Sequence, residues 1–194
     1  MNQYFSSTIH DIINTTFPMI IVTVIVLVTI RLIYLIKNKI HFTMYKELFL
    51  LTFIIYILCL FQIVTVGDTV SWSTNNFVPF KEIMRYDFGS ALFFKNIIGN
   101  ILLFLPFGFF VSQILKSKDV ILPLIIIIIC SICIETVQLY IGRVFDVDDI
   151  ILNIAGGVLG YFVYRIFCYV GSKIPRVFKS EIFLNIITLL LFII

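Results

Sequence analysis

The residues of this sequence best suited to chemistry are carboxylates and amides embedded in long apolar runs. Glu135 stands among Ile and Cys residues, with Ser131 four positions before it and Gln138 three after it, so the three share one helical face. An ionisable side chain at the centre of a membrane helix costs about 2.5–3.5 kcal/mol on insertion scales, which predicts that this face points into a helix bundle. A structural hydrogen-bond node and a contact to a substrate or ion are both compatible with Glu135.

The densest polar stretch runs from residue 142 to residue 153. Its three aspartates, Asp146, Asp148 and Asp149, precede an apolar segment, where acidic side chains cap free amides and complement the helix dipole. Capping accounts for one or two of the three aspartates but does not require all of them. The Asp-x-Asp start lacks the later Gly and bidentate Glu of an EF-hand loop, so that calcium motif is rejected and no metal site is predicted.

Two asparagines, Asn96 and Asn100, share a face at the start of another apolar run. They are expected at a depth from which Glu135 can be reached, so their amides are plausible partners for its carboxyl group. Upstream, Trp72, Phe77 and Phe80 lie in a loop of about 25 residues, and anchoring at the level of the lipid headgroups accounts for these aromatics.

The candidate binding pocket collects the polar residues expected at one face of the membrane. For Arg85, a solvated surface or pairing with Asp87 is the alternative. Catalytic residues and a cofactor are not identified, because the P-loop, GxSxG and zinc-type patterns are missing from the sequence. The candidate residues are Asn76, Arg85, Asn96, Asn100, Glu135, Gln138, Arg143, Asp146, Asp148, Asp149 and Asn153.

Composition indicates that membrane helices position these residues. The chain is 61% hydrophobic and 13% charged, with a mean hydropathy of +1.12, which is far too apolar for an ordinary soluble domain. The predicted fold is an all-α, polytopic transmembrane helical bundle of about five spans with a short apolar C-terminal segment, 182–194, which is left unassigned. The expected spans are roughly 18–36, 47–66, 92–115, 120–141 and 150–170. The expected parts are an N-terminal anchor helix with a basic loop (1–45), the helical bundle (46–170) and a basic linker with an apolar tail (171–194).

The distribution of basic residues predicts an orientation. Net charge is +3, but the Lys and Arg residues alternate between loops in the manner of membrane topology, so no nucleic-acid partner is expected. The loops after the first, third and fifth spans are basic and are predicted inside. The N-terminus and the polar stretch at 142–153 are therefore predicted outside. The same stretch leads into Gly156 and Gly160, whose spacing permits close helix contact.

Four ordered blocks give the sequence a resemblance to the VanZ-like family. They are residues 76–80, residues 96–108, the Ser131–Gln138 face, and the stretch from Gly142 through Asn153 to Gly160. The family is named for a membrane protein associated with resistance to the glycopeptide teicoplanin, and the resemblance covers roughly residues 77–165. It implies an integral protein of the bacterial cell membrane and leaves the molecular mechanism open.

Three functions are compatible with this reading. In the first, the outward-facing polar pocket engages an envelope lipid, a cell-wall precursor or a lipophilic glycopeptide and lowers teicoplanin susceptibility. In the second, a membrane enzyme uses Glu135 and an aspartate on a lipid-linked or glycan-like substrate. In the third, the chain is a structural partner of another membrane protein, and Gly156 and Gly160 matter more than the carboxylates. The oligomeric state is not predicted.

Overall fold

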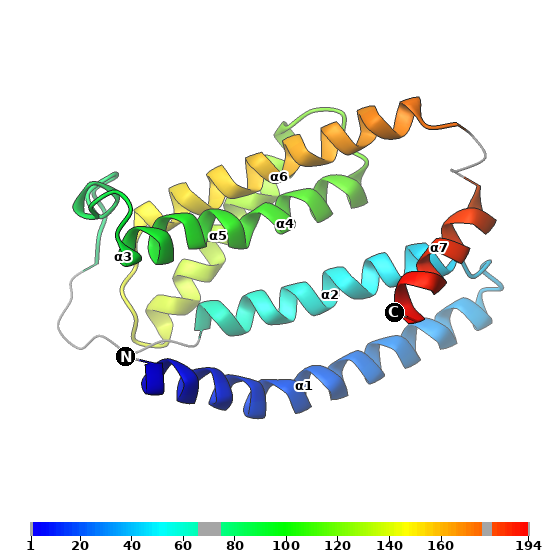
Figure 1. The fold of residues 1–194 in the computed structure, drawn as a ribbon, viewed down its shortest axis with the longest axis horizontal. Coiled ribbons are helices and arrows are strands. Elements are labelled where there is room, and N and C mark those ends of the chain that lie inside the picture. The colour runs from blue at the N-terminus through cyan, green and yellow to red at the C-terminus, as the bar shows by residue number, and fades with distance from the viewer. Residues whose placement is uncertain (1, 66–74, 176–179, 194) are drawn as a thin grey trace. The chain divides into compact units, whose positions relative to one another are not determined.

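The computed structural model describes residues 2–65, 75–175 and 180–193 of the 194-residue chain, with side chains described from residue 17 to residue 189. Figure 1 shows a chain built from helices, as the sequence predicts. The elements are α1 Asn2–Lys37, α2 Met44–Thr65, η1 Ile83–Arg85, α3 Ala91–Phe93, η2 Phe94–Ile98, α4 Gly99–Leu115, α5 Ile121–Tyr140, α6 Val147–Lys173 and α7 Glu181–Ile193.

Within the described ranges, five helices are long and apolar enough to cross a membrane, which confirms the expected number of spans. The third is composite, because α3, the π-helical turn η2 and α4 follow one another without a break. The α1 helix begins at Asn2, well before the apolar run that was expected to form it. The five spans are Phe17–Lys37, Met44–Thr65, Ala91–Leu115, Ile121–Tyr140 and Val147–Lys173.

Contacts group the chain into two compact units, which are described separately. The first unit contains residues 1–62 and 174–194, and the second contains residues 63–173. The second unit therefore holds the composite third span, α5, α6 and every residue of the candidate pocket.

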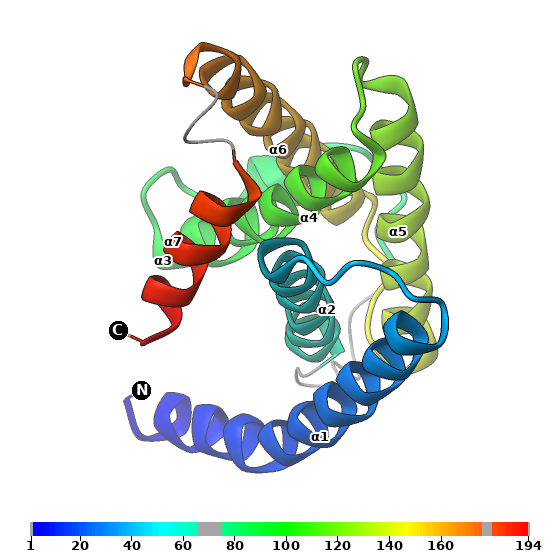
Figure 2. The same ribbon diagram turned by 90° about the vertical axis from the view of Figure 1, so that its right-hand side faces the viewer.

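Close approach of α4 and α6 forms the centre of the second unit. The two helices run side by side in Figures 1 and 2. A Cβ atom on Gly156 would overlap the backbone of Ile101, and one on Gly160 would overlap the backbone of Leu105. The sequence expectation of close contact at these glycines is confirmed, and α4 is the partner helix.

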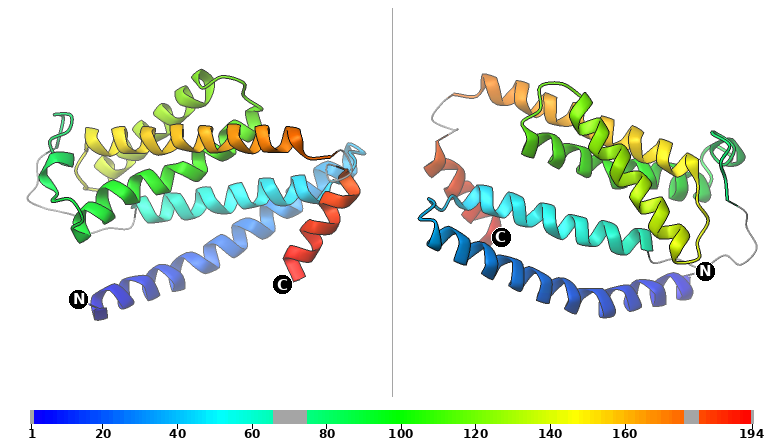
Figure 3. Two further views of the ribbon diagram at one scale, coloured as in Figure 1. Left: turned by 45° about the horizontal axis from the view of Figure 1, so that its top comes forward. Right: turned by 180° about the vertical axis from the view of Figure 1, so that it is seen from behind.

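The α5 helix covers the same pair of helices. It is seen beside α4 and α6 in both views of Figure 3. Ile127 of α5 is fully buried and lies against Gly157 of α6, while Phe104 of α4 is also fully buried. These contacts fix the rotation of α5, and that rotation decides where its polar face points.

In the first unit, a short connection joins α1 to α2. The Arg31 guanidinium donates to both oxygens of Glu47, from Nε at 2.8 Å and from Nη2 at 3.0 Å. The run left unassigned from the sequence forms α7, whose Asn185 side chain accepts from the Tyr45 amide at 3.2 Å. With 13 residues, α7 is about 20 Å long, shorter than the bilayer core.

Candidate functional site

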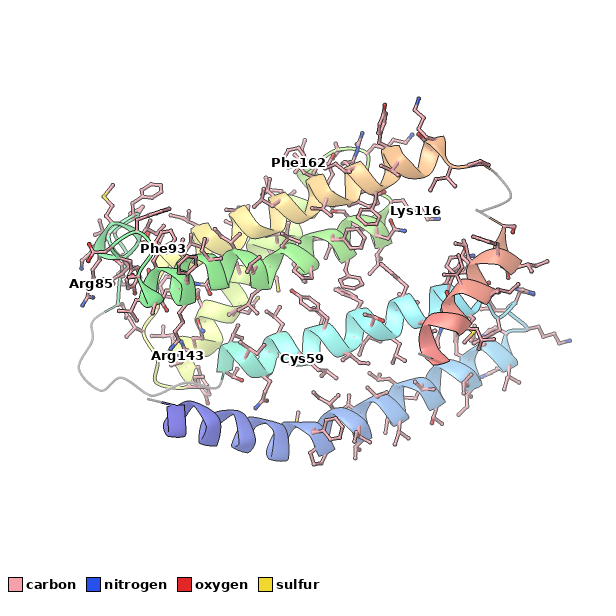
Figure 4. All side chains as sticks on the ribbon, in the orientation of Figure 1. Cys59, Arg85, Phe93, Lys116, Arg143 and Phe162 are labelled. Atoms are coloured by element: carbon pink, nitrogen blue, oxygen red, sulfur yellow. The ribbon has the colours of Figure 1, made fainter. Side chains whose placement is uncertain are left out.

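The polar residues converge where the ends of several helices meet. Figure 4 labels Arg143 at the junction of α5 and α6, with Phe93 at the start of the third span and Lys116 at the opposite end of α4. Hydrogen bonds join the last turn of α2, the loop at 75–83, the third span, α5 and the first turn of α6. We call the following side chains the polar cluster: Asn76, Asn96, Asn100, Glu135, Gln138, Arg143, Asp146, Asp148, Asp149 and Asn153.

Glu135 is the most deeply buried carboxylate of the cluster together with Asp148, each 1% exposed. Its Oε2 accepts from the Asp146 amide at 3.0 Å. Ser131 and Gln138 on the same helix are also buried, which confirms that this face of α5 points into the bundle.

Asp146 begins α6 as a capping residue. Its Oδ1 accepts from the Asp148 amide at 2.8 Å and from Nδ2 of Asn76 at 2.8 Å. The Asn76 backbone pairs with the same segment, donating to the Phe145 carbonyl at 2.9 Å and accepting from Val147 at 3.1 Å. Burial raises the pKa of Asp146, and the hydrogen bonds from Asp148 and Asn76 oppose that rise.

Asp148 organises the loop before the third span. Its carboxylate accepts from the amides of Phe80 at 2.5 Å, Glu82 at 2.7 Å and Ile83 at 3.1 Å. These three amides satisfy a buried charge, so Asp148 fixes the loop rather than facing an open site. Of the three aspartates, Asp146 alone caps α6 through its side chain among the described contacts.

Asp149 faces the third span. Its Oδ1 accepts from Nδ2 of Asn100 at 2.6 Å, and the Arg143 charge lies close enough to interact with both Asp149 and Glu135. From the sequence, Asn100 was a plausible partner for Glu135; in the structure its amide donates to Asp149 instead. The register of α6 on α4 presents Asp149 rather than Glu135 to this amide.

Asn96 also has a different partner from the one expected. Its side chain forms a hydrogen bond with Tyr86, and burial raises the pKa of the Tyr86 phenol while this hydrogen bond lowers it. Asn96 lies within the π-helical turn η2, a geometry that is frequent at functional sites.

Gln138 and Arg143 bind the end of α2. Gln138 Nε2 donates to the Val64 carbonyl at 2.9 Å, and Arg143 Nη1 donates to the same oxygen at 2.7 Å. The last carbonyls of a helix lack partners within it, so these two side chains terminate α2.

Asn153 and Arg85 complete the set of candidates. Asn153 is buried and donates to Ser131 Oγ at 3.1 Å, which joins α6 to α5. Arg85 is 74% exposed and pairs with Glu82 at 3.1 Å, so it lies outside the polar cluster, and its partner is not Asp87.

Two carboxylate oxygens of the cluster keep unused hydrogen-bonding capacity. Among the described residues, the hydrogen bonds of these two side chains go to Glu135 Oε2 and Asp149 Oδ1, and none is formed with Glu135 Oε1 or Asp149 Oδ2. Glu135 is buried and Asp149 is half-buried. Because buried polar atoms nearly always have partners, these oxygens are the positions at which a ligand can add one. Over the same ranges, no group of three His, Cys, Asp or Glu residues has a metal-binding arrangement.

Comparison with protein families assigns the chain. The VanZ/LLP1 family model matches residues 48–168, more than half of the sequence. The chain belongs to the VanZ/LLP1 family. Curated proteins and solved structures contain no significant match.

The matched range of this VanZ/LLP1 membrane protein contains the whole polar cluster. It includes α2 from residue 48, the loop at 75–83, the composite third span, α5 and most of α6. The α7 helix and most of α1 lie outside it.

Sequence reasoning missed three contributors to the site in this VanZ/LLP1 protein. They are Tyr86, the Val64 carbonyl and the backbone amides between Phe80 and Ile83. Tyr86 stands in the polar stretch between Arg85 and Asp87 and could have been included on that ground. Backbone groups leave no trace in a pattern of residue types, so the other two required the structure.

Proposed function

We propose that this VanZ/LLP1 protein uses its polar cluster, at the outer face of the bacterial cell membrane, to engage an envelope lipid, a cell-wall precursor or a lipophilic glycopeptide. Engagement lowers the susceptibility of the cell to teicoplanin. Family membership supports the link to this antibiotic, and the geometry of the cluster supports a binding role.

The observation that carries the proposal is the unused capacity of Glu135 and Asp149. Burying carboxylates among helices costs free energy, and well-packed apolar residues are often as stable or more stable in their place. One oxygen of Glu135 accepts from the Asp146 amide, and one oxygen of Asp149 accepts from the Asn100 side chain. A polar ligand between these helices would use the two remaining oxygens, which packing alone does not require.

The proposed side of the membrane rests on the alternation of basic loops. Residues Lys116 and Lys118 follow the third span at the end of α4 opposite to the cluster. Short basic loops favour the cytoplasm, which supports an outer position for the cluster. A tag before Phe17 should react with an impermeant reagent in intact cells, and reaction only after lysis would reverse the orientation.

Antibiotic susceptibility tests the proposed function. Wild type, Glu135→Gln and Asp149→Asn are expressed at matched membrane abundance in a sensitive host, and the inhibitory concentrations of teicoplanin and vancomycin are measured. We expect wild type to raise the teicoplanin value and both variants to lose that protection. Gln and Asn keep an acceptor for the Asp146 and Asn100 contacts, so folding should be preserved.

Asp87→Asn is the matched control for these variants. Asp87 is exposed on the loop before the third span and lies outside the cluster. The control should protect as well as wild type does. Protection that survives in Glu135→Gln and Asp149→Asn would contradict the proposal, and so would a wild type that gives no protection.

A membrane enzyme is the second candidate, because the Glu135 and Asp149 carboxylates lie close enough to interact electrostatically. Two such groups can serve as acid and base when their environments differ. A lipid-linked or glycan-like envelope component whose structure changes only with intact Glu135 would favour this function over binding. The third function, a structural partner, has less support because Gly156 and Gly160 pack against α4 of the same chain.

A further inference from the structure

The segment between residues 77 and 94 presents an unusually apolar outer surface. Phe88 is 91% exposed and Met84 is 83% exposed, although both are large apolar side chains. Exposed apolar patches of this kind mark contacts with a membrane or with another protein. The exposed residues of this apolar collar are Phe77, Val78, Phe80, Met84, Phe88, Leu92 and Phe94.

The inner side of the apolar collar has the opposite character. Three hydrogen bonds connect the amides of Phe80, Glu82 and Ile83 to the buried Asp148 carboxylate. Phe80 has a positive φ of 66°, a conformation that is unfavourable for a bulky residue and needs support from its surroundings. The hydrogen bonds supply that support, so the collar is held with its polar backbone inward and its apolar side chains outward.

The apolar collar is continuous with the surface of a membrane span. Leu92 and Phe94 belong both to the collar and to the first turns of the third span. Ser90 caps the start of that span by accepting from the Phe93 amide at 3.1 Å, so the loop part of the collar passes directly into the span. Figure 4 shows Arg85 on the loop and Phe93 on the adjoining helix.

Exposed charged residues are interleaved with the apolar side chains of the collar. Lys81, Arg85 and Asp87 are exposed within the same segment. Long basic side chains can extend to the headgroups while neighbouring apolar side chains enter the acyl region. This pattern suits the boundary of a bilayer better than a dry protein interface, whose centre is depleted of charge.

We infer that the apolar collar docks into the membrane at the boundary between headgroups and acyl chains, with bilayer lipids as its occupant. Met84 and Phe88 enter the acyl region beyond the anchoring that the sequence suggests for Phe77 and Phe80. Asp148 connects the collar to the first turn of α6, so docking holds this turn near headgroup level. The inference concerns the lipid contact itself and does not depend on which ligand the cluster binds.

Tryptophan fluorescence measures this docking directly. In the full chain carrying Trp72→Phe, a single tryptophan is placed by Met84→Trp or Phe88→Trp. The protein is reconstituted in vesicles of phosphatidylcholine and phosphatidylglycerol whose acyl chains carry bromine either near the headgroup or near the methyl end. Leu102→Trp, at an exposed position within the third span, provides the reference for lipid contact, and Lys118→Trp, in the polar loop after α4, provides the reference for water.

If the collar docks into the membrane, brominated lipids should quench the tryptophan at position 84 or 88 about as strongly as the tryptophan at position 102. Lipids with bromine near the headgroup should quench positions 84 and 88 more than lipids with bromine near the methyl end. Quenching no greater than at position 118, together with quenching by aqueous acrylamide, would mean that the collar faces water. Protection from both quenchers would mean that a second copy or another protein covers it. Either of these two results overturns the inference.

Asp148→Asn in the Met84→Trp chain tests the support of the collar. Because an amide group cannot satisfy three backbone donors as a carboxylate does, we expect lipid quenching to fall and acrylamide quenching to rise. Quenching identical to that of the parent would show that Asp148 does not hold the collar at the membrane and would remove that step from the inference.

Discussion

The first two spans and the last three differ in how much of their surface is buried in the protein. The α1 and α2 spans have the highest mean hydropathies, 2.8 and 2.5, yet only 6% of each is buried in the protein. The α6 span has the lowest value, 1.6, and 39% of it is buried. The α5 span has a hydropathy of 2.4, close to that of α2, yet 33% of it is buried. Hydropathy alone therefore does not indicate which helices pack against protein, whereas small and polar residues at the helix contacts do.

Helix contacts within a membrane depend on small and polar residues because the surrounding solvent is lipid. Lipid chains are as apolar as leucine, so apolar side chains gain little by leaving lipid for a helix interface. The α4, α5 and α6 helices therefore associate through glycines and polar side chains such as Ser131 and Asn153. Between α1 and α2, the described polar contact is the Arg31–Glu47 pair.

The largest effect is expected from a substitution that disrupts the packing of α4 against α6. Gly156→Ala places a methyl group on the Ile101 backbone, which cannot move aside as a flexible side chain would. We expect a loss of about 1–3 kcal/mol in the free energy of unfolding, the range for overpacked interiors. Unfolding in mixed detergent micelles measures it.

Gly171→Ala is the control on the same helix. A Cβ atom there meets no atom within 4 Å, so the change should be neutral or slightly stabilising, since alanine favours helix. Equal effects of the two substitutions would show that close approach of α4 does not distinguish Gly156 from an ordinary helical glycine.

A smaller effect is expected from the ion pair in the first unit. Glu47→Gln removes the carboxylate that accepts from both Nε and Nη2 of Arg31. Arg31→Gln, Glu47→Gln and the double variant form a mutant cycle, in which the coupling energy should be about 1 kcal/mol, the scale of hydrogen bonds between membrane helices. A coupling energy of zero would mean that the pair orients α1 and α2 without stabilising their contact.

The smallest effect is expected in the pH dependence of stability, through Asp146 in the second unit. Burial raises the pKa of Asp146 in the folded protein, so folding favours its protonated form. Its contribution to stability is complete below the unfolded value of about 3.9 and is lost as pH rises through the folded value. The difference in unfolding free energy between wild type and Asp146→Asn should therefore change over this window, since Asn retains the cap.

Asp119→Asn is the matched control for the pH measurement. Asp119 is exposed and accepts from the Ile121 amide at 3.2 Å near the start of α5, so it makes a similar local contact without the burial. A dependence on pH of equal size in both variants would assign the effect to capping rather than to burial of Asp146.

Much of the architecture could be predicted from residue types along the chain. The five spans follow from apolar length, the inward face of α5 from the spacing of Ser131, Glu135 and Gln138, and close packing from Gly156 and Gly160. Each of these is a local property or a property of one helix. The partners across helices did not follow, because they depend on the register between helices distant in sequence.

The three aspartates at the start of α6 separate what the sequence determined from what only the tertiary structure determined. The sequence determined that an acidic helix start lies at the end of the bundle, since aspartates before an apolar run favour that position. It could not distinguish their roles, because each residue turns the helix by about 100° and so faces a different neighbour. Packing alone gave Asp146 the cap, Asp148 the amides of the collar, and Asp149 the Asn100 side chain.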